Sequence, residues 1–311
     1  MENAEPEWIG RDPGLLTARA RLKIAAPSAL PVLVLGETGT GKELAARTVH
    51  AGSAASSGPF LALNCGAVPD GLIESELFGA GRGAFTGAVE RAGLVEAAEG
   101  GTLFLDEIGD AGPQFQMKLL RLLDGAAGIG EFRRLGEART RRARTRIVAA
   151  THHDLPRAVR EGRFRADLWY RLAAIEVTLP PLRSRGDDVL LLARAFLARA
   201  RPGTYLDADA RAVVRGYAWP GNVRELAQAM AHAAVFAGPG GVVGVDSLPD
   251  RIRQPAGGVA PPATLEAELA GLEALRIEQA LREAGGNRSR AARRLGLSRQ
   301  GLWRKLKRRA P

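Results

Sequence analysis

A glycine-rich segment near the start of the chain has the residue types that bind phosphate. It follows the apolar run Val32–Leu35 and precedes a stretch with helical spacing, Glu43–His50. Glycines let backbone amides turn toward a phosphate at a helix N-terminus, and Lys42 adds a mobile positive charge. This pattern predicts a strand, a phosphate-binding loop (the P-loop) and a helix, although Glu43 replaces the hydroxyl that usually holds Mg²⁺. A plain glycine turn is the alternative. The candidate nucleotide contacts are Gly36, Glu37, Thr38, Gly39, Thr40, Gly41, Lys42 and Glu43.

Two adjacent acids, Asp106 and Glu107, end a second apolar run that begins at Thr102. Neighbouring residues on a strand point to opposite sides, so the two carboxylates can serve different tasks. We expect Asp106 to hold Mg²⁺ and Glu107 to orient and deprotonate an attacking water. A pair of exposed acids at the start of a loop is the alternative interpretation.

Two arginines are candidates for charge stabilisation of a transferring phosphoryl group, and a third could report the state of the nucleotide. Arg165 and Arg171 lie on one predicted helix, where they could act on a neighbouring subunit, and a salt bridge or solvated face is the alternative. Arg224 opens a later helix and could reach back to the nucleotide. Arginine is abundant throughout this chain, so composition alone supports none of them.

The sequence Thr151-His152-His153 follows another predicted strand. Paired histidines suggest a metal site, but we expect adjacent side chains to diverge, and no third ligand has suitable spacing. We therefore interpret Thr151 and His152 as polar groups that sense the terminal phosphate. The arginine-rich run 139–146 is interpreted as a solvated hairpin, with DNA contact as the alternative.

The charge of +10 is concentrated at one end of the chain. Residues 281–311 contain eleven Arg and Lys against one acid, and the remaining residues balance. A neutral body with a basic end indicates nucleic-acid binding. Cys65 is the only cysteine, which excludes an internal disulfide and suits a reducing cytoplasm. No apolar run is long enough to span a membrane.

Strands alternate with helices in the first part of the chain. Predicted strands are Val32–Leu35, Phe60–Asn64, Thr102–Leu105 and Arg146–Ala150. Such alternation implies a mostly parallel sheet covered on both faces. After Leu179 only helical spacing remains, in Val189–Arg201, Asp207–Gly216 and Asn222–Ala237. We expect an α/β domain in residues 1–180, a small helical domain in 181–252, a Pro/Gly linker in 253–264 and an all-α domain in 265–311.

The basic end has the pattern of two helices joined by a turn. Arg288–Leu295 and Ser298–Arg308 are the predicted helices, and Ser298 can cap the second. This second helix suits the major groove, where Arg and Gln read base edges and other basic residues hold phosphates. A basic helix without DNA contact is the alternative. The candidate DNA contacts are Arg288, Ser298, Arg299, Gln300, Arg304, Lys305 and Lys307.

Together these motifs resemble the enhancer-binding activators of bacterial sigma-54 RNA polymerase, which are AAA-plus ATPases with a helical lid and a Fis-type helix-turn-helix. The most specific element is the hexapeptide Gly83, Ala84, Phe85, Thr86, Gly87 and Ala88, the GAFTGA loop. The resemblance implies that this loop contacts sigma-54, that Asn64 restrains the catalytic Glu107, and that Ile9 and Gly10 contact adenine. It also implies that Arg165 and Arg171 act in trans, and that Glu43 is ordinary in this family's P-loop.

Three features depart from the family pattern. His152 replaces an asparagine, residues 125–130 form a longer connection, and no receiver or ligand-sensing domain precedes the ATPase. We therefore expect a form without an N-terminal regulatory domain, controlled by another protein, by expression level or by a segment outside this sequence.

The resemblance implies an ATP- and Mg²⁺-dependent transcription activator in the cytoplasm, hexameric when active. It would bind enhancer DNA and remodel the closed complex of sigma-54 polymerase. Two other functions are alternatives: a DNA-binding regulator with an idle ATPase fold, and an ATP-driven loader or helicase acting on DNA. The intact Asp106, Glu107 and GAFTGA loop disfavour the first. The second would need basic or aromatic residues in that loop, and Arg82 is the only charge near it.

Overall fold

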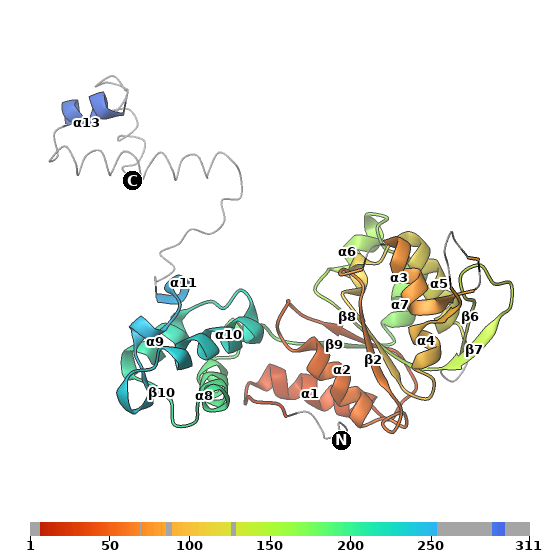
Figure 1. Cartoon of the computed structure of the whole chain (residues 1–311), viewed down its shortest axis with the longest axis horizontal. Helices are drawn as coiled ribbons and strands as arrows, with labels where there is room; N and C mark the ends of the chain where they lie inside the picture. Colours follow the sequence, from red (N-terminus) through yellow and green to blue (C-terminus); the bar gives the residue numbers. More distant parts are fainter. Residues whose placement is uncertain are drawn as a thin grey trace. The chain divides into compact units, whose positions relative to one another are not determined.

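The computed structural model divides the chain into two compact units, Met1–Pro255 and Ala256–Pro311 (Figure 1). It describes residues 7–68, 70–81, 83–84, 89–125, 129–253 and 288–295. Within these residues, no helix is long and apolar enough to cross a membrane. Several predicted sites lie outside the described residues: Phe85, Thr86, Gly87, Ala88, Ser298, Arg299, Gln300, Arg304, Lys305 and Lys307. Residues 254–264 of the predicted linker and residues 126–128 of the longer connection lie outside them as well, whereas Arg253, predicted to open the linker, ends a helix.

The first unit is built on a five-stranded parallel sheet with the order β2-β5-β8-β1-β9. These strands are β1 (Val32–Leu35), β2 (Phe60–Asn64), β5 (Thr102–Asp106), β8 (Arg146–Thr151) and β9 (Ile175–Thr178). The first four confirm the predicted strands. The strand β9 was missed because it is a short edge strand in which only Val177 is fully buried.

Helices cover both faces of this sheet, as predicted. On one face, α1 (Pro13–Ala25) and α2 (Lys42–Ala51) pack on Val32 and Val34. The alternate strand residue Leu33 packs in a second core with helices of the other face. These helices are α3 (Asp70–Phe78), α4 (Leu94–Ala97), α5 (Pro113–Leu123), α6 (Leu155–Arg160) and α7 (Ala166–Leu172). The result is a three-layer α/β sandwich (Figure 1).

Two short antiparallel pairs flank the sheet. One joins β3 (Gly79–Ala80) to β4 (Arg91–Ala92), and the other joins β6 (Ile129–Phe132) to β7 (Arg141–Arg144). The second pair confirms the hairpin that was predicted in the arginine-rich run. Since β7 leads directly into β8, this hairpin is continuous with a central strand of the sheet.

The helical part of the first unit, the lid, has its own core around Trp219. Its main helices are α8 (Asp188–Ala200), α9 (Ala208–Gly216) and α10 (Asn222–Val235), followed by α11 (Asp250–Arg253). A two-residue parallel pair, β10 (Tyr205–Leu206) and β11 (Val242–Val243), was not predicted because it is too short to show a period. In the second unit the described helix is α13 (Arg288–Arg294), within the first helix predicted there.

The lid is fastened to the P-loop through Asn222, which is fully buried and has a left-handed φ of 51°. Its amide nitrogen donates to the Thr38 carbonyl at 3.0 Å and to Glu37 Oε2 at 3.2 Å. Its carbonyl oxygen accepts from the Leu182 amide at 2.8 Å. One side chain therefore satisfies backbone groups of both subdomains, and an unpaired buried group would be costly.

Glu37 also forms a two-pronged ion pair with Arg183, at 2.6 and 2.5 Å. The hydrogen bonds from Arg183 lower the pKa of Glu37 from 4.5 to about 2, against the opposing effect of burial. The pair therefore stabilises the folded state at pH values above the ordinary glutamate pKa of 4.5. This contribution is lost as the pH falls toward about 2, because protonation of Glu37 breaks the ion pair.

We expect the free energy of unfolding of the wild-type chain to fall more steeply than that of Glu37→Gln as the pH falls from 4.5 to about 2, the interval between the ordinary and the lowered pKa of Glu37. The amide in this variant keeps the shape of the side chain but does not titrate. Urea unfolding followed by tryptophan fluorescence at a series of pH values measures the difference. Parallel profiles for the two proteins would show that the pair contributes nothing.

Candidate active site at the carboxyl edge of the sheet

The P-loop connects β1 to α2 and takes backbone conformations that favour glycine. Gly39 and Gly41 have φ of 81° and 104°. A Cβ on Gly39 would lie 2.2 Å from the Gly221 carbonyl oxygen of the lid, so the loop also needs glycine for space. Gly41 caps α2 without a side-chain hydrogen bond, which leaves amides of the first turn available to an anion.

Lys42 begins α2 and is almost completely buried, with 6% of its side chain exposed. Its Nζ donates to the Gly36 carbonyl at 3.1 Å and to Glu107 Oε1 at 3.0 Å. The lysine therefore links the P-loop to the acidic end of β5. Its charge is compensated inside the site.

Asp106 ends β5, and Glu107 leaves the strand with a left-handed φ of 51°. Such a conformation is strained for a residue with a side chain. Burial and the neighbouring Glu107 raise the pKa of Asp106, although Lys42 and Arg224 oppose them. Burial alone would raise the pKa of Glu107, but hydrogen bonds from His152 and Lys42 lower it overall. The pKa values of the two carboxyl groups therefore shift in opposite directions, and the site favours the ionised form of Glu107.

His152 follows β8 and reaches the same carboxylate. Its backbone nitrogen and its Nδ1 lie 3.1 and 2.7 Å from Glu107 Oε2. The preceding residue, Thr151, is fully buried, and its hydroxyl accepts from the His153 amide. The expectation that His152 and His153 diverge was wrong, because their rings lie 4.0 Å apart and are tilted by 35°. No group of three or more metal-ligating side chains occurs among the described residues.

Asn64 lies opposite Asp106 in the sheet register, at the end of β2. Its carbonyl oxygen accepts from the amides of Gly66 and Ala67, both at 3.0 Å. The side chains recorded on the Glu107 carboxylate are Lys42 and His152 instead. The restraining role expected of Asn64 therefore stays a prediction.

The start of α10 touches the P-loop. The amides of Val223 and Arg224 donate to the Gly39 carbonyl at 2.9 and 3.3 Å. The positive charge of Arg224 lowers the pKa of Asp106, which places this charge in the electrostatic range of the acids. Asn222 and Arg183 were not predicted as site residues. The turn-forming residues Pro220, Gly221 and Asn222 are the sequence signal that could have pointed to Asn222.

Ile9 and Gly10 are held against the lid by a buried ion pair of Arg185 and Asp188, each 3% exposed. Arg185 donates to the Ile9 carbonyl at 3.0 Å, and Asp188 accepts from the Arg11 amide at 2.6 Å. A Cβ on Gly10 would lie 2.4 Å from Asp188 Oδ2, so only glycine fits there. The segment thus contacts the lid, and its expected contact with adenine stays a prediction.

Arg165 and Arg171 are about half exposed and lie at α7. Arg165 pairs with Asp167 and Arg171 with Asp124, at 2.7 and 3.1 Å. These partners belong to neither the P-loop nor the acidic pair. Within one chain, these ion pairs therefore bring neither arginine to Lys42 or Glu107.

The base of the GAFTGA loop is fixed to the turn of the β6–β7 hairpin. Leu135 donates to the Gly79 carbonyl and accepts from the Gly81 amide, at 3.0 and 2.8 Å. A Cβ on Gly136 would lie 2.7 Å from the Ala84 Cα, so turn and loop are in close contact.

Arg134 adds charge to this junction. Its guanidinium is bound to both carboxylate oxygens of Glu96 and to Glu90, which precedes β4. Gly83 and Ala84 are the described residues of the expected sigma-54 contact. They follow β3, which the hydrogen bonds to Leu135 hold against the hairpin.

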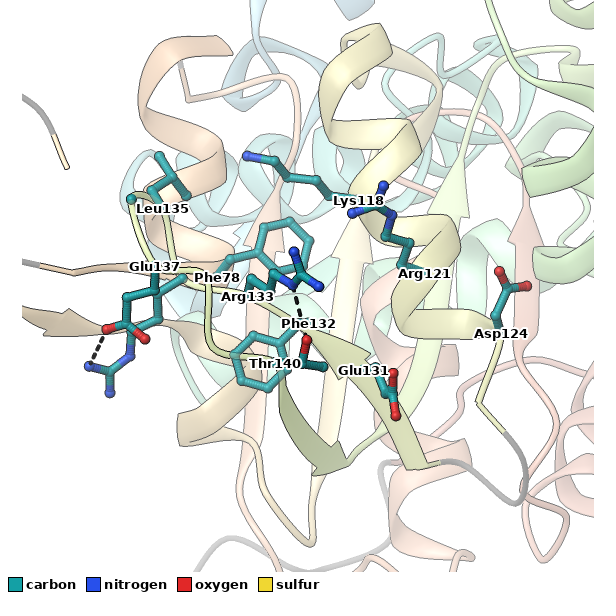
Figure 2. Close-up of a pocket in the computed structure, with 12 residues that line it drawn as sticks. Phe78, Lys118, Arg121, Asp124, Glu131, Phe132, Arg133, Leu135, Glu137 and Thr140 are labelled. Atoms are coloured by element: carbon teal, nitrogen blue, oxygen red, sulfur yellow. Dashed lines mark hydrogen bonds and ion pairs between the residues drawn. The ribbon is translucent and has the colours of Figure 1, made fainter.

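A cavity of about 660 Å³ lies between α5 and the hairpin. Figure 2 shows Lys118 and Arg121 of α5 facing the hairpin residues Arg133 and Thr140 across it. Its lining contains no residue of the P-loop, so this cavity and the candidate nucleotide site are separate. It adjoins the base of the GAFTGA loop.

Comparison with protein families assigns the chain in three consecutive parts. Residues 8–178 match the sigma-54 interaction domain, residues 183–263 the AAA+ ATPase lid domain, and residues 268–308 the bacterial regulatory protein, Fis family. The hydrogenase transcriptional regulatory protein HoxA of Cupriavidus necator is 45% identical over 89% of this chain and 60% of its own length. The regulatory protein AtoC of Escherichia coli is 45% identical over 91% of this chain and 63% of its own length.

The chain spans about 60% of the length of the curated relatives it matches. Among solved structures, NtrX from Brucella abortus in complex with ATP superposes with a TM-score of 0.74 at 30% identity, covering 98% of this chain and 70% of that one. The model of the sigma-54 interaction domain covers more than half of the chain and includes the P-loop and the acidic pair. The chain therefore belongs to the sigma-54-dependent enhancer-binding transcription regulators, with an AAA+ P-loop ATPase domain, its lid and a Fis-type DNA-binding domain.

Proposed function

We propose that this chain is an ATP-hydrolysing transcription activator that binds enhancer DNA and remodels the closed complex of sigma-54 RNA polymerase through its GAFTGA loop. The main support is the position of β8. One end carries His152, which is hydrogen-bonded to Glu107, and the other end continues into the hairpin that clamps the loop base. Chemistry at the nucleotide and movement of the loop thus share one strand.

Hydrolysis needs charge placed around the phosphates and a base for water. Lys42 and the uncapped amides of the P-loop would hold the phosphates of ATP. Asp106 fits Mg²⁺ because its carboxylate ends a strand next to this loop, and a bound cation would offset the burial that raises its pKa. Mg²⁺ would neutralise charge on the phosphate oxygens. Glu107 would orient and deprotonate the attacking water.

Assembly would complete the site. Arg165 and Arg171 are exposed and their recorded partners lie outside the P-loop, so we propose that they act on the nucleotide of a neighbouring copy in a ring. An arginine supplied in this way is worth about 10³ to 10⁵ in turnover. We propose a hexamer for the active form, because the family resemblance implies it.

Movement would pass from the nucleotide to the loop base. A shift of Glu107 and His152 displaces the end of β8, and the hairpin carries this displacement to Leu135 and Arg134. Arg224 and Asn222 couple the same event to the lid, since both contact the P-loop. Phe85 and Thr86 would make the contact with sigma-54.

The Fis-type domain would bring the ring to DNA. We propose that Gln300, Arg299 and Arg304 read bases, while Lys305, Arg308 and Arg309 hold phosphates. A protein with promoter DNA and polymerase as its partners would act in the cytoplasm. Another protein acting in trans, the expression level or a segment outside this sequence would control it.

Glu107→Gln should bind ATP but hydrolyse it at least a hundredfold more slowly, because an amide accepts no proton from water and general base catalysis contributes roughly 10² to 10⁴ in rate. Phosphate release at saturating ATP measures turnover, and a fluorescent ATP analogue measures binding. Normal turnover in this variant would remove Glu107 from the mechanism.

Thr86→Ala should keep its ATPase activity and lose sigma-54 binding, because the resemblance assigns Thr86 to the sigma-54 contact and not to the nucleotide contacts. Co-sedimentation with sigma-54 in the presence of an ATP transition-state mimic measures the contact. Val89→Ala, at an exposed position just beyond the loop, is the matched control and should retain binding. Unchanged binding by Thr86→Ala would show that the contact lies elsewhere.

A further inference from the structure

Both oxygens of the catalytic carboxylate are already engaged. Glu107 Oε1 accepts from Lys42 Nζ at 3.0 Å, and Oε2 accepts from the amide and Nδ1 of His152 at 3.1 and 2.7 Å. Each carboxylate oxygen can accept two hydrogen bonds, so Oε2 is saturated and Oε1 has one acceptor position left for a water within about 3.2 Å. The contacts with Lys42 and His152 therefore fix the position of the carboxylate.

The hydrogen on His152 can be assigned from its partner. A deprotonated carboxylate only accepts hydrogen bonds, and the backbone amide of His152 already donates to the same oxygen, Glu107 Oε2. Nδ1 must therefore carry the proton and donate it. Hydrogen bonds to a charged acceptor are stronger than neutral ones, so this contact holds the carboxylate firmly.

The two contacts differ in what a nucleotide would do to them. Lys42 belongs to the P-loop, and the phosphates would draw its ammonium away from Oε1. Oε2 would remain on His152. His152 would therefore still hold the position of the Glu107 carboxylate through Oε2 after ATP enters.

The imidazole is fixed by its neighbours. Its ring lies 4.0 Å from the ring of His153, whose Nε2 is 2.7 Å from Asp110 Oδ1. Asp110 is three residues after Glu107, in the short helix η1 (Ile108–Asp110). The restraint thus closes a loop between the end of β5 and the end of β8.

We propose that His152 is a positioning residue that holds Glu107 in a restrained setting until the terminal phosphate is engaged, the task that the family resemblance gives to Asn64. The carbonyl oxygen of Asn64 is instead used by the amides of its own turn. This inference rests on the proposed ATP hydrolysis by Glu107.

Two variants test separately the N–H donor and the aromatic ring of His152. His152→Phe keeps an aromatic ring beside His153 but removes the donor, whereas His152→Asn removes the ring but keeps an N–H group. His152→Phe should raise basal kcat roughly threefold to tenfold, the effect of releasing one charge-assisted hydrogen bond, with nucleotide KM within about twofold of wild type. His152→Asn should raise kcat less than His152→Phe does, because its side-chain N–H group can still donate to Glu107.

Steady-state phosphate release by the full chain, at concentrations where copies associate, gives both constants. His232→Ala, on the exposed side of α10, controls for the loss of a histidine and should match wild type. A kcat for His152→Phe at or below wild type would overturn the proposal, as would an equal rise in His152→Asn, which would point to the ring rather than the donor. If wild type itself shows no turnover, the proposed hydrolysis fails; if wild type turns over and His152→Phe does not exceed it, only the restraint fails.

Discussion

The carboxylate of Glu107 is held from two sides, and the rest of the site depends on this double contact. Lys42 reaches it from the P-loop and His152 from the end of β8, so three separate segments meet on one side chain. A parallel sheet makes this possible, because its strands all end at the same edge. The contact also keeps Lys42 paired, and a buried charge without its partner costs about 3–5 kcal/mol.

The lid depends on a comparable single residue. Asn222 is buried in a left-handed conformation and joins the amide of Leu182 to the carbonyl of Thr38. A rotation of the lid must therefore either carry the P-loop with it or break these hydrogen bonds. Under the proposed function, a nucleotide that moves the P-loop would therefore also shift the position of the lid.

Local patterns predicted the framework, and contacts between distant residues escaped them. The runs of β1, β2, β5 and β8 are short, apolar and bounded by glycine or polar residues, so the sequence pattern was sufficient to predict these strands. The edge strand β9 has one fully buried residue and no comparable signal. Asn222 and Glu37 lie 185 positions apart, and no spacing rule connects them. The pairing of His152 with Glu107 depends on strand order, which the sequence pattern does not state.

The central claim is that adjoining copies complete one nucleotide site, Glu107 from one chain and Arg165 from the next. Its most direct test is to mix Glu107→Gln with Arg165→Ala, each inactive alone, and to measure ATP turnover. In mixed rings, an intact Glu107 can face an intact Arg165 of its neighbour, so turnover should rise well above the sum of the separate samples. Turnover equal to that sum, in samples shown to exchange subunits, would contradict a shared site.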